Sequence, residues 1–145
     1  MPTVQDVLHT KSNIVHCIEP GVTVLDAIHK MNQHKLGALV VKTGDQVVGM
    51  FTERDVLRRV LGEGRNAAEV KVGQVMTQEV ICCSPEMDLD EVGAIMKEKR
   101  IRHLPVCDGE GKLHGMISIG DLNAFNVTQQ EAQIHFLNDY IYGRA

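Results

Sequence analysis

Short apolar runs alternate along this chain with segments in which apolar residues recur every three or four positions. The run at 38–41 is apolar throughout, which is typical of a strand buried on both faces. Segments 23–36 and 88–99 follow the helical period, and each begins with a residue that can cap a helix, Thr23 or Asp88. The pattern predicts helices over these two segments and strands at 14–18, 38–41, 46–51, 80–83, 103–107 and 113–117.

The predicted elements occur twice in the same order, because the second half of the chain repeats the first. The offset is 65 residues, and it becomes 66 after one extra residue in the second turn. The matched pairs are Cys17 and Cys82, Pro20 and Pro85, Met31 and Met96, Val41 and Val106, Gly44 and Gly109, and Gly49 and Gly115. One duplication within 145 residues predicts a mixed α/β (α+β) fold of two β-α-β-β-α units related by a pseudo-two-fold axis.

The repeat divides the chain into four parts. We expect the first unit at 1–62, a linker at 63–71, the second unit at 72–127 and a C-terminal helix at 128–145. Each unit alone is small for a stable core, so we expect the two sheets to pack face to face. The last helix carries Ile134, Leu137 and Ile141 at helical spacing and is expected to dock on the body or on a second subunit.

Both units end their last strand in the same turn, which reads glycine, two apolar residues, a hydroxyl residue, two further residues and aspartate. It spans Gly49–Asp55 in the first unit and Gly115–Asp121 in the second. A hydroxyl residue followed three positions later by an acid is a capping box, and capping alone would explain the motif. The glycine, however, leaves space for another segment or a ligand, and a helix N-terminus favours phosphate. Since a carboxylate can accept hydrogen bonds from a ribose diol, a nucleotide site is the second interpretation.

Composition narrows the class of function. The chain is 43% hydrophobic and 23% charged, and its net charge of −4 argues against electrostatic capture of nucleic acid or acidic membrane. Basic residues gather at 97–103, which we interpret as a solvated helix face, with a small anion site as the alternative. No apolar run approaches the roughly 18 residues of a membrane span and no signal-peptide pattern is present, so we expect a cytoplasmic protein with reduced thiols.

Chemistry-bearing side chains form no recognisable catalytic or metal-binding pattern. The seven histidines and four cysteines lack the spacing of a metal site, and no Ser-His-Asp or Cys-His set can be assembled. We therefore expect no bound metal, no catalytic cofactor and no enzymatic activity.

Several features together resemble a tandem pair of cystathionine-β-synthase-type (CBS) domains, the Bateman module, of the stand-alone bacterial type. They are the repeat itself, both turns, the run His103-Leu104-Pro105-Val106 and the segment Val75-Met76-Thr77. The resemblance covers about residues 3–127. It implies a regulatory module that binds an adenosine-containing ligand, such as AMP, ATP, NAD or S-adenosylmethionine, in clefts between the two units.

The resemblance also implies roles for individual residues. Ribose hydroxyls would be bound by Asp55 and Asp121, and phosphate or ribose by Thr52 and Ser118. Adenine would be flanked by segments that contain Ile18, Thr77, Val80 and Ile81. The second unit's cleft would be lined by Arg102, His103 and Pro105.

The two clefts are expected to differ in charge. Arg54 would supply a phosphate cation to the first cleft, whereas Gly120 lies between the hydroxyl and the acid in the second. Conversely, the first unit has Gly37 and Val40 where the second has Arg102 and Pro105. On these differences the second cleft is the better fit to a nucleotide.

Three functions remain open on the sequence. The first is a homodimeric nucleotide sensor that acts by conformational coupling on an effector protein in trans. The second is a structural dimerisation module whose turns are capping boxes and whose clefts are degenerate. The third, nucleic-acid binding through residues 97–103, is disfavoured by the net charge.

Overall fold

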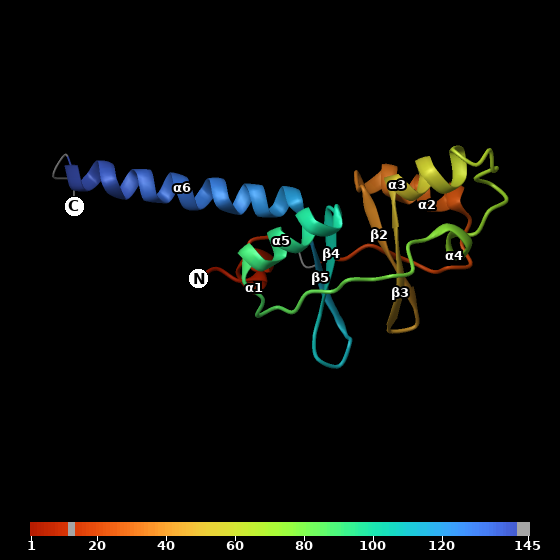
Figure 1. The fold of residues 1–145 in the computed structure, drawn as a ribbon, viewed down its shortest axis with the longest axis horizontal. Helices are drawn as coiled ribbons and strands as arrows, with labels where there is room; N and C mark the ends of the chain where they lie inside the picture. The colour runs from red at the N-terminus through yellow and green to blue at the C-terminus, as the bar shows by residue number, and fades with distance from the viewer. Residues whose placement is uncertain (12–13, 142–145) are drawn as a thin grey trace.

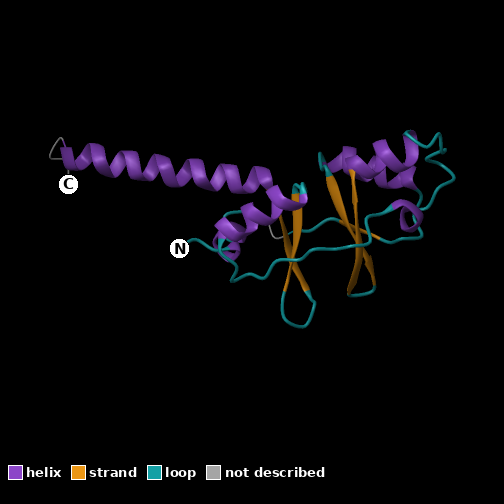
Figure 2. Ribbon diagram, in the orientation of Figure 1, coloured by secondary structure: helices purple, strands orange, loops and turns teal. Residues whose placement is uncertain are grey.

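The computed structural model describes residues 1–11 and 14–141. In chain order its elements are α1 (Val4–Leu8), β1 (Cys17–Ile18), α2 (Val24–His34), β2 (Ala38–Thr43), β3 (Gln46–Thr52), α3 (Glu53–Asp55), the π-helical turn η1 (Val56–Leu61), α4 (Val72–Val75), α5 (Leu89–Lys99), β4 (His103–Cys107), β5 (Leu113–Ser118) and α6 (Ile119–Ile141). The hairpins β2–β3 and β4–β5 stand next to each other, with helices toward both outer sides (Figures 1 and 2). The predicted mixed α+β class is confirmed.

The matched helices α2 and α5 begin and end in similar ways. The Thr23 hydroxyl accepts a hydrogen bond from the backbone N–H of Asp26 at 3.2 Å, as a helix cap requires. The Asp88 carboxylate caps α5 by accepting from the N–H of Asp90 at 2.8 Å. Both helices end at a basic residue in the left-handed region, Lys35 at φ 56° and Arg100 at φ 55°.

The two sheets differ at the strand that precedes each helix. In the first unit, β1 pairs in parallel with β2, and β2 pairs antiparallel with β3. In the second unit, β4 pairs with β5, but the predicted strand at 80–83 is reduced to an isolated bridge between Cys83 and Val106. The prediction of a full strand there was wrong.

The reason is Pro105, which has no backbone N–H to donate to the ladder. At the matched position in the first unit, the Val40 N–H donates to the carbonyl of His16 at 3.3 Å. In the second unit only the hydrogen bonds around Cys83 remain: its N–H donates to the Pro105 carbonyl and its carbonyl accepts from Cys107, both at 2.9 Å. The segment before Cys83 is therefore held to β4 at one end.

Each unit completes its core with a helix that precedes the other unit in sequence. In α1, Val4 and Val7 are buried against Leu104 and Ile117 of the second unit. In α4, matching side chains enter the core of the first unit, where Val72 and Val75 pack with Leu39 and Phe51. Backbone hydrogen bonds fix the exchange, from Val4 N–H to the Met87 carbonyl and from Val72 N–H to the Val22 carbonyl, both 2.9 Å. The two units are thus interlocked.

The glycine that opens each turn lies where the exchanged helix approaches the sheet. A Cβ at Gly49 would lie 2.6 Å from Met76 Sδ and 2.9 Å from the backbone oxygen of Thr77. A Cβ at Gly115 would lie 2.9 Å from a methyl carbon of Leu8. Of the two explanations for this glycine, the structure thus favours close approach of another chain segment.

Helix α6 begins at the second turn and continues as one helix away from the body (Figure 1). Near its start it contacts α1, α5 and β5. Further along, Ile134 is 57% exposed and Leu137 is 50% exposed, so these two side chains do not dock on the body. The side chain of Ile141 and residues 142–145 lie outside the described part, and docking on a second subunit stays a prediction.

Candidate functional site

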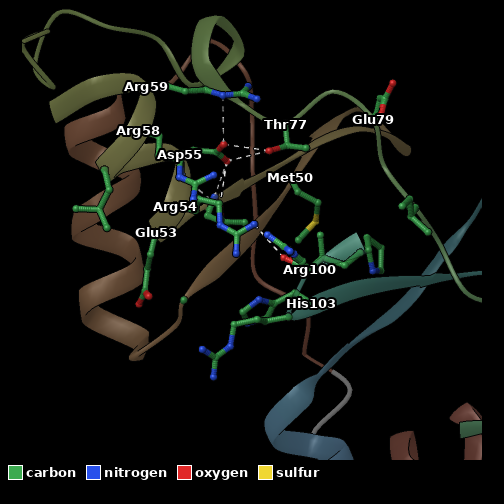
Figure 3. A pocket seen from close by; sticks show the side chains of 17 residues that line it. Met50, Glu53, Arg54, Asp55, Arg58, Arg59, Thr77, Glu79, Arg100 and His103 are labelled. Atoms are coloured by element: carbon green, nitrogen blue, oxygen red, sulfur yellow. Dashed lines mark hydrogen bonds and ion pairs between the residues drawn. The ribbon is translucent and has the colours of Figure 1, made fainter. Parts of the chain in front are cut away.

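A cavity of about 570 Å³ lies between the two units, beside the first turn (Figure 3). Its walls come from the β3–α3 turn, from η1, from the segment that leads into the second unit, and from the junction of α5 with β4. The lining residues are Gly37, Met50, Thr52, Glu53, Arg54, Asp55, Leu57, Arg58, Arg59, Thr77, Glu79, Ile81, Arg100, Ile101, Arg102, His103 and Pro105.

The first turn is a capping box, as the simpler interpretation of the motif predicts. The backbone N–H of Thr52 donates to Asp55 Oδ2 at 3.0 Å, and the N–H of Asp55 donates to Thr52 Oγ1 at 3.4 Å. The second turn repeats both bonds, at 2.8 Å from Ser118 N–H and at 3.1 Å to Ser118 Oγ. Capping is therefore common to the two turns, and a difference in ligand binding has to come from other groups.

Asp55 is the buried charge of the first turn, with 3% of its surface exposed. The Thr77 hydroxyl from the second unit donates to Asp55 Oδ1 at 3.0 Å, and Arg59 Nε lies 3.8 Å from the same oxygen. The Thr52 hydroxyl also donates to Asp55 Oδ2, at 3.3 Å, so a ligand that binds this carboxylate has to displace one of these donors. Asp55 thus joins the two units at the floor of the cavity.

The cavity is rich in guanidinium groups, which outnumber its carboxylates by five to three. Two of them are held by backbone oxygens: Arg54 Nη1 donates to the carbonyl of Arg100 at 2.9 Å, and Arg59 Nη1 to that of Met76 at 2.9 Å. Among the described residues, the side chains of Arg58, Arg100 and Arg102 have neither hydrogen bond nor ion pair. These exposed cations leave the cavity with unneutralised positive charge, which favours an anionic ligand.

His103 lies among these cations at the start of β4 (Figure 3). Burial lowers its pKa, and the charge of Arg102 lowers it further, against the opposing influence of Glu53 and Asp121. The imidazole is therefore neutral at pH 7 in this structure and can either donate or accept a hydrogen bond.

The second turn faces a much smaller cleft, of about 80 Å³. Its carboxylate, Asp121, is hydrogen-bonded by the ammonium of Lys11 at 2.7 Å, and the same ammonium donates to the carbonyl of Met116 at 2.9 Å. In the first cleft, Thr77 makes the corresponding contacts, with its N–H on the Met50 carbonyl at 2.8 Å and its hydroxyl on the aspartate. A lysine side chain thus replaces a threonine and fills the second cleft from within.

The Lys11 ammonium also changes the acidity of Asp121. Partial burial acts to raise the pKa of Asp121, but the hydrogen bonds and charge of Lys11, with those of Ser118, outweigh it and lower the pKa. The carboxylate is thereby committed to an internal partner. The sequence comparison favoured the second cleft for a nucleotide, whereas the volumes of the two clefts favour the first.

The structure brings eight of the predicted site residues into the larger cavity: Thr52, Arg54, Asp55, Thr77, Ile81, Arg102, His103 and Pro105. Arg102, His103 and Pro105, which were expected in the second unit's cleft, line this cavity, and β4 also pairs His103 with Ser118 of the second turn. Ile18 is in the core of the first unit, and Val80 packs between the sheets. Ser118 and Asp121 belong to the second turn and do not line this cavity.

Sequence reasoning missed the other cations of the cavity. Arg58 and Arg59 follow Asp55 by three and four residues, which on a helix is one turn away, and this spacing could have identified them. Arg100 was assigned with its neighbours to a solvated face or a small anion site, and it lies at the rim of the cavity. Nothing in the spacing indicates that it meets Arg54 across the two units.

Among the described residues, no second ligand site is identified by a further hollow or by a metal-ligand cluster. A hollow of about 780 Å³ between the hairpin tips holds none of the predicted residues. No group of three or more His, Cys, Asp or Glu side chains within 1–11 and 14–141 could hold a metal ion. Over the same residues, no helix combines the length and apolarity needed to cross a membrane.

Known proteins match the chain over most of its length. A family model described as "CBS domain" matches residues 4–62 and 72–125. The CBS domain-containing protein CBSX3, mitochondrial, of Arabidopsis thaliana is 42% identical over 126 residues, which cover 83% of this chain and 61% of that protein. The chain thus spans under two thirds of that relative.

Solved structures share the fold. A putative signal-transduction protein with CBS domains from Burkholderia ambifaria superimposes with a TM-score of 0.86 at 39% identity, covering 89% of this chain and 96% of that one. The CBS domain pair of protein MJ0100, in complex with 5′-methylthioadenosine and S-adenosyl-L-methionine, gives a TM-score of 0.78 at 19% identity and covers 88% and 98%.

Proposed function

The chain belongs to the CBS domain family, and on this premise we propose that it is a regulatory module that binds one phosphorylated adenosine compound per chain in the cavity at the first turn. The observation that carries the proposal is the composition of this cavity. It combines a buried carboxylate with five guanidinium groups contributed by both units, in a volume of about 570 Å³. Volumes of about 300–1,000 Å³ are usual for small-molecule sites.

The chemistry of the walls suits the parts of a nucleotide. Asp55 would accept hydrogen bonds from the ribose hydroxyls, with the Thr77 hydroxyl rotating to make room. The apolar side chains of Met50, Ile81 and Pro105 would flank the adenine ring. Guanidinium groups recognise phosphate in a bidentate geometry, so Arg58, Arg100 and Arg102 would hold the phosphates.

The excess of cations selects among adenosine ligands. MJ0100, which is similar to this chain in fold, was solved with 5′-methylthioadenosine and S-adenosyl-L-methionine, two compounds that carry the adenosyl group without phosphate. A sulfonium would face five guanidinium groups here and would be repelled. We therefore propose AMP, ATP or NAD in preference to S-adenosylmethionine.

Binding would act through the arrangement of the two units. The cavity walls come from both units, so a ligand that fits one arrangement better than another shifts the equilibrium between them. The output would pass to an effector protein in trans from a homodimer. The exposed side chains of Ile134 and Leu137 on α6 support contact with a second subunit.

A structural dimerisation module is the second candidate. It is favoured by the second cleft, where Lys11 satisfies Asp121 without a ligand, and by the capping role of both turns. On this hypothesis the larger cavity would bind no ligand. The two candidate functions therefore differ only in whether the protein responds to nucleotides.

Isothermal titration calorimetry on the full chain separates the two candidates. We expect ATP, AMP or NAD to bind with one site per chain, and S-adenosylmethionine to bind more weakly than any of the three. Native mass spectrometry of the same sample gives the subunit count and any co-purified ligand. If no adenosine compound produces heat or a thermal shift, the sensor function is wrong and the structural module stands.

A further inference from the structure

Two cysteine side chains lie against each other at the edge of the second unit. Cys107 Sγ donates a hydrogen bond to Cys82 Sγ across 3.3 Å, from β4 to the segment that precedes α5. The backbone bridge between Cys83 and Val106 holds these two segments parallel to each other, next to the cysteine pair. A disulfide has its sulfurs about 2.05 Å apart, so closure requires a movement of about 1.2 Å from the 3.3 Å contact.

The two thiols differ in access. Cys82 is exposed, while Cys107 is buried behind it. Burial, together with the contact to Cys82, raises the pKa of Cys107 to about 12, so at neutral pH this thiol is protonated and a poor first target for an oxidant. A reagent from solvent therefore reaches the Cys82 thiol first, and the Cys107 thiol lies next to it.

The other two cysteines, Cys83 and Cys17, are not placed to react in place of Cys82 or Cys107. Cys83 is 2% exposed, and its thiol donates to the carbonyl of Pro105 at 3.6 Å, in the core of the second unit. Cys17 matches Cys82 in the repeat, but Lys42 stands where Cys107 is in the second unit. The first unit therefore provides an internal control, a cysteine in the same fold position without a partner thiol.

We infer that Cys82 and Cys107 form a reversible oxidation site that closes to a disulfide on reaction with a peroxide. The Cys82 thiol loses its proton, the thiolate attacks one oxygen of hydrogen peroxide, and the O–O bond breaks. A sulfenic acid forms, and the departing hydroxide takes up the thiol proton and leaves as one water. The Cys107 sulfur then attacks the sulfenic sulfur, and the hydroxyl leaves with the Cys107 proton as a second water. Two thiols are oxidised by two electrons and one peroxide is reduced, so atoms and electrons balance.

The site is connected to the ligand cavity through its nearest neighbours in sequence. Ile81 precedes Cys82 and Pro105 lies two residues before Cys107, and both line the cavity. The segment carrying Ile81 lacks a ladder hydrogen bond to β4, since Pro105 has no N–H to donate. The disulfide would supply a covalent link at this weak point and fix the wall of the cavity. This consequence rests on the proposed function, because it concerns nucleotide affinity.

Chemical analysis of the full-length protein tests the oxidation site without reference to any ligand. After treatment with one equivalent of hydrogen peroxide under native conditions, we expect the free thiols to fall from four to two. Mass spectrometry should show the loss of two hydrogens, a Cys82–Cys107 linked peptide pair, and recovery of all thiols with dithiothreitol. Cys82→Ser and Cys107→Ser should each abolish the linked pair, and Cys17→Ser should leave it unchanged.

Other products would overturn the inference. Linkage of Cys82 to Cys83, a covalent dimer through Cys82, or conversion of Cys82 to a sulfinic acid that dithiothreitol does not reduce would each show that Cys107 is not its partner. Retention of four thiols would do the same. The link to the cavity is tested separately with ATP as the probe: oxidised protein should bind it at least threefold more tightly, because the wall is preorganised. Equal affinity in both redox states would refute that link.

Discussion

The two clefts of this molecule share a turn, a cap and a carboxylate, and they differ in what lies opposite the carboxylate. In the first cleft Thr77 offers a short hydroxyl, and about 570 Å³ remains open. In the second, the ammonium of Lys11 reaches the carboxylate and about 80 Å³ remains. A motif that positions an acid is therefore insufficient to define a binding site, because the facing residue decides whether the acid is available.

The same comparison explains the distribution of charge. The larger cavity collects Arg54 from the first unit and Arg102 from the second. At the matched positions stand Gly120 and Gly37. One cleft is thus cationic and open, and the other is neutralised by an internal ion pair.

The comparison is tested most strongly by removing each carboxylate. Asp55→Ala should weaken ATP binding at least about 100-fold, or about 2.8 kcal/mol, because charge-assisted hydrogen bonds to the ribose are lost. The matched control Asp121→Ala removes the same cap from a cleft without ligand and should change ATP affinity less than about twofold. Calorimetry measures both, with circular dichroism to verify folding. Equal losses would contradict the assignment of the ligand to the first cleft.

Alanine substitutions at Gly49 and Gly115, the glycines that open the two turns, should destabilise the protein to different extents. Gly49→Ala would place a Cβ 2.9 Å from the backbone oxygen of Thr77, which cannot move without disturbing α4, and overpacking of this kind costs about 1–3 kcal/mol. Gly115→Ala meets the methyl end of Leu8 at 2.9 Å, which can rotate, so its cost should be smaller. Urea denaturation measures both. A larger loss at Gly115 would show that the side-chain end is the more rigid neighbour.

Removing one unpaired cation should reduce selectivity for phosphate. Arg102→Ala is expected to weaken ATP binding about tenfold, or about 1.4 kcal/mol, and to leave adenosine binding unchanged. Lys97→Ala removes an exposed cation on α5 outside the cavity and serves as the charge-matched control. Titrations at 50 mM and 200 mM salt separate a local contact from general attraction, since the latter is screened in both variants.

The smallest effect is expected at Lys11. Lys11→Met removes an ion pair with a lysine side chain 34% exposed, so solvent screening limits the loss of stability to less than about 1 kcal/mol at pH 7. Because the pair lowers the pKa of Asp121 below 3.8, its contribution is present above that value and is lost as the pH falls through the lowered pKa. The difference between wild type and variant should shrink from pH 7 to pH 3. A difference that is constant with pH would assign it to packing.

Local patterns account for what could be predicted from the sequence. The helical period gave α2 and α5 with their caps, and the repeat gave the mixed fold and the family, which the match to CBS domains confirms. These features depend on residues within a few positions of one another or on a fixed offset. The strand predicted at 80–83 is reduced to one bridge, because Pro105 acts on it from more than 20 residues away.

The repeat does not show which side chains line each cleft, because the two halves differ in the length of one segment. Between α1 and the matched cysteine lie eight residues, 9–16, whereas the corresponding segment after Met76 has five, 77–81. The longer segment carries Lys11 to a position that Thr77 occupies in the other half, and an offset of 65 residues does not reveal this. Likewise, Arg102 was assigned to its own unit because the sequence shows the unit that carries a residue and not the cleft that it faces.

The exchange of α1 and α4 has a consequence for synthesis on the ribosome. When residues 1–62 have left the exit tunnel, the first unit still lacks Val72 and Val75, and α1 still lacks the strands that will cover it. The core of the first unit can close once α4 has emerged, whereas α1 has no core to join until β4 and β5 have been made. Residues 1–11 of the nascent chain should therefore stay sensitive to protease well beyond the first repeat. In a duplicated domain of independent units the first residues made would pack first, whereas here they pack last.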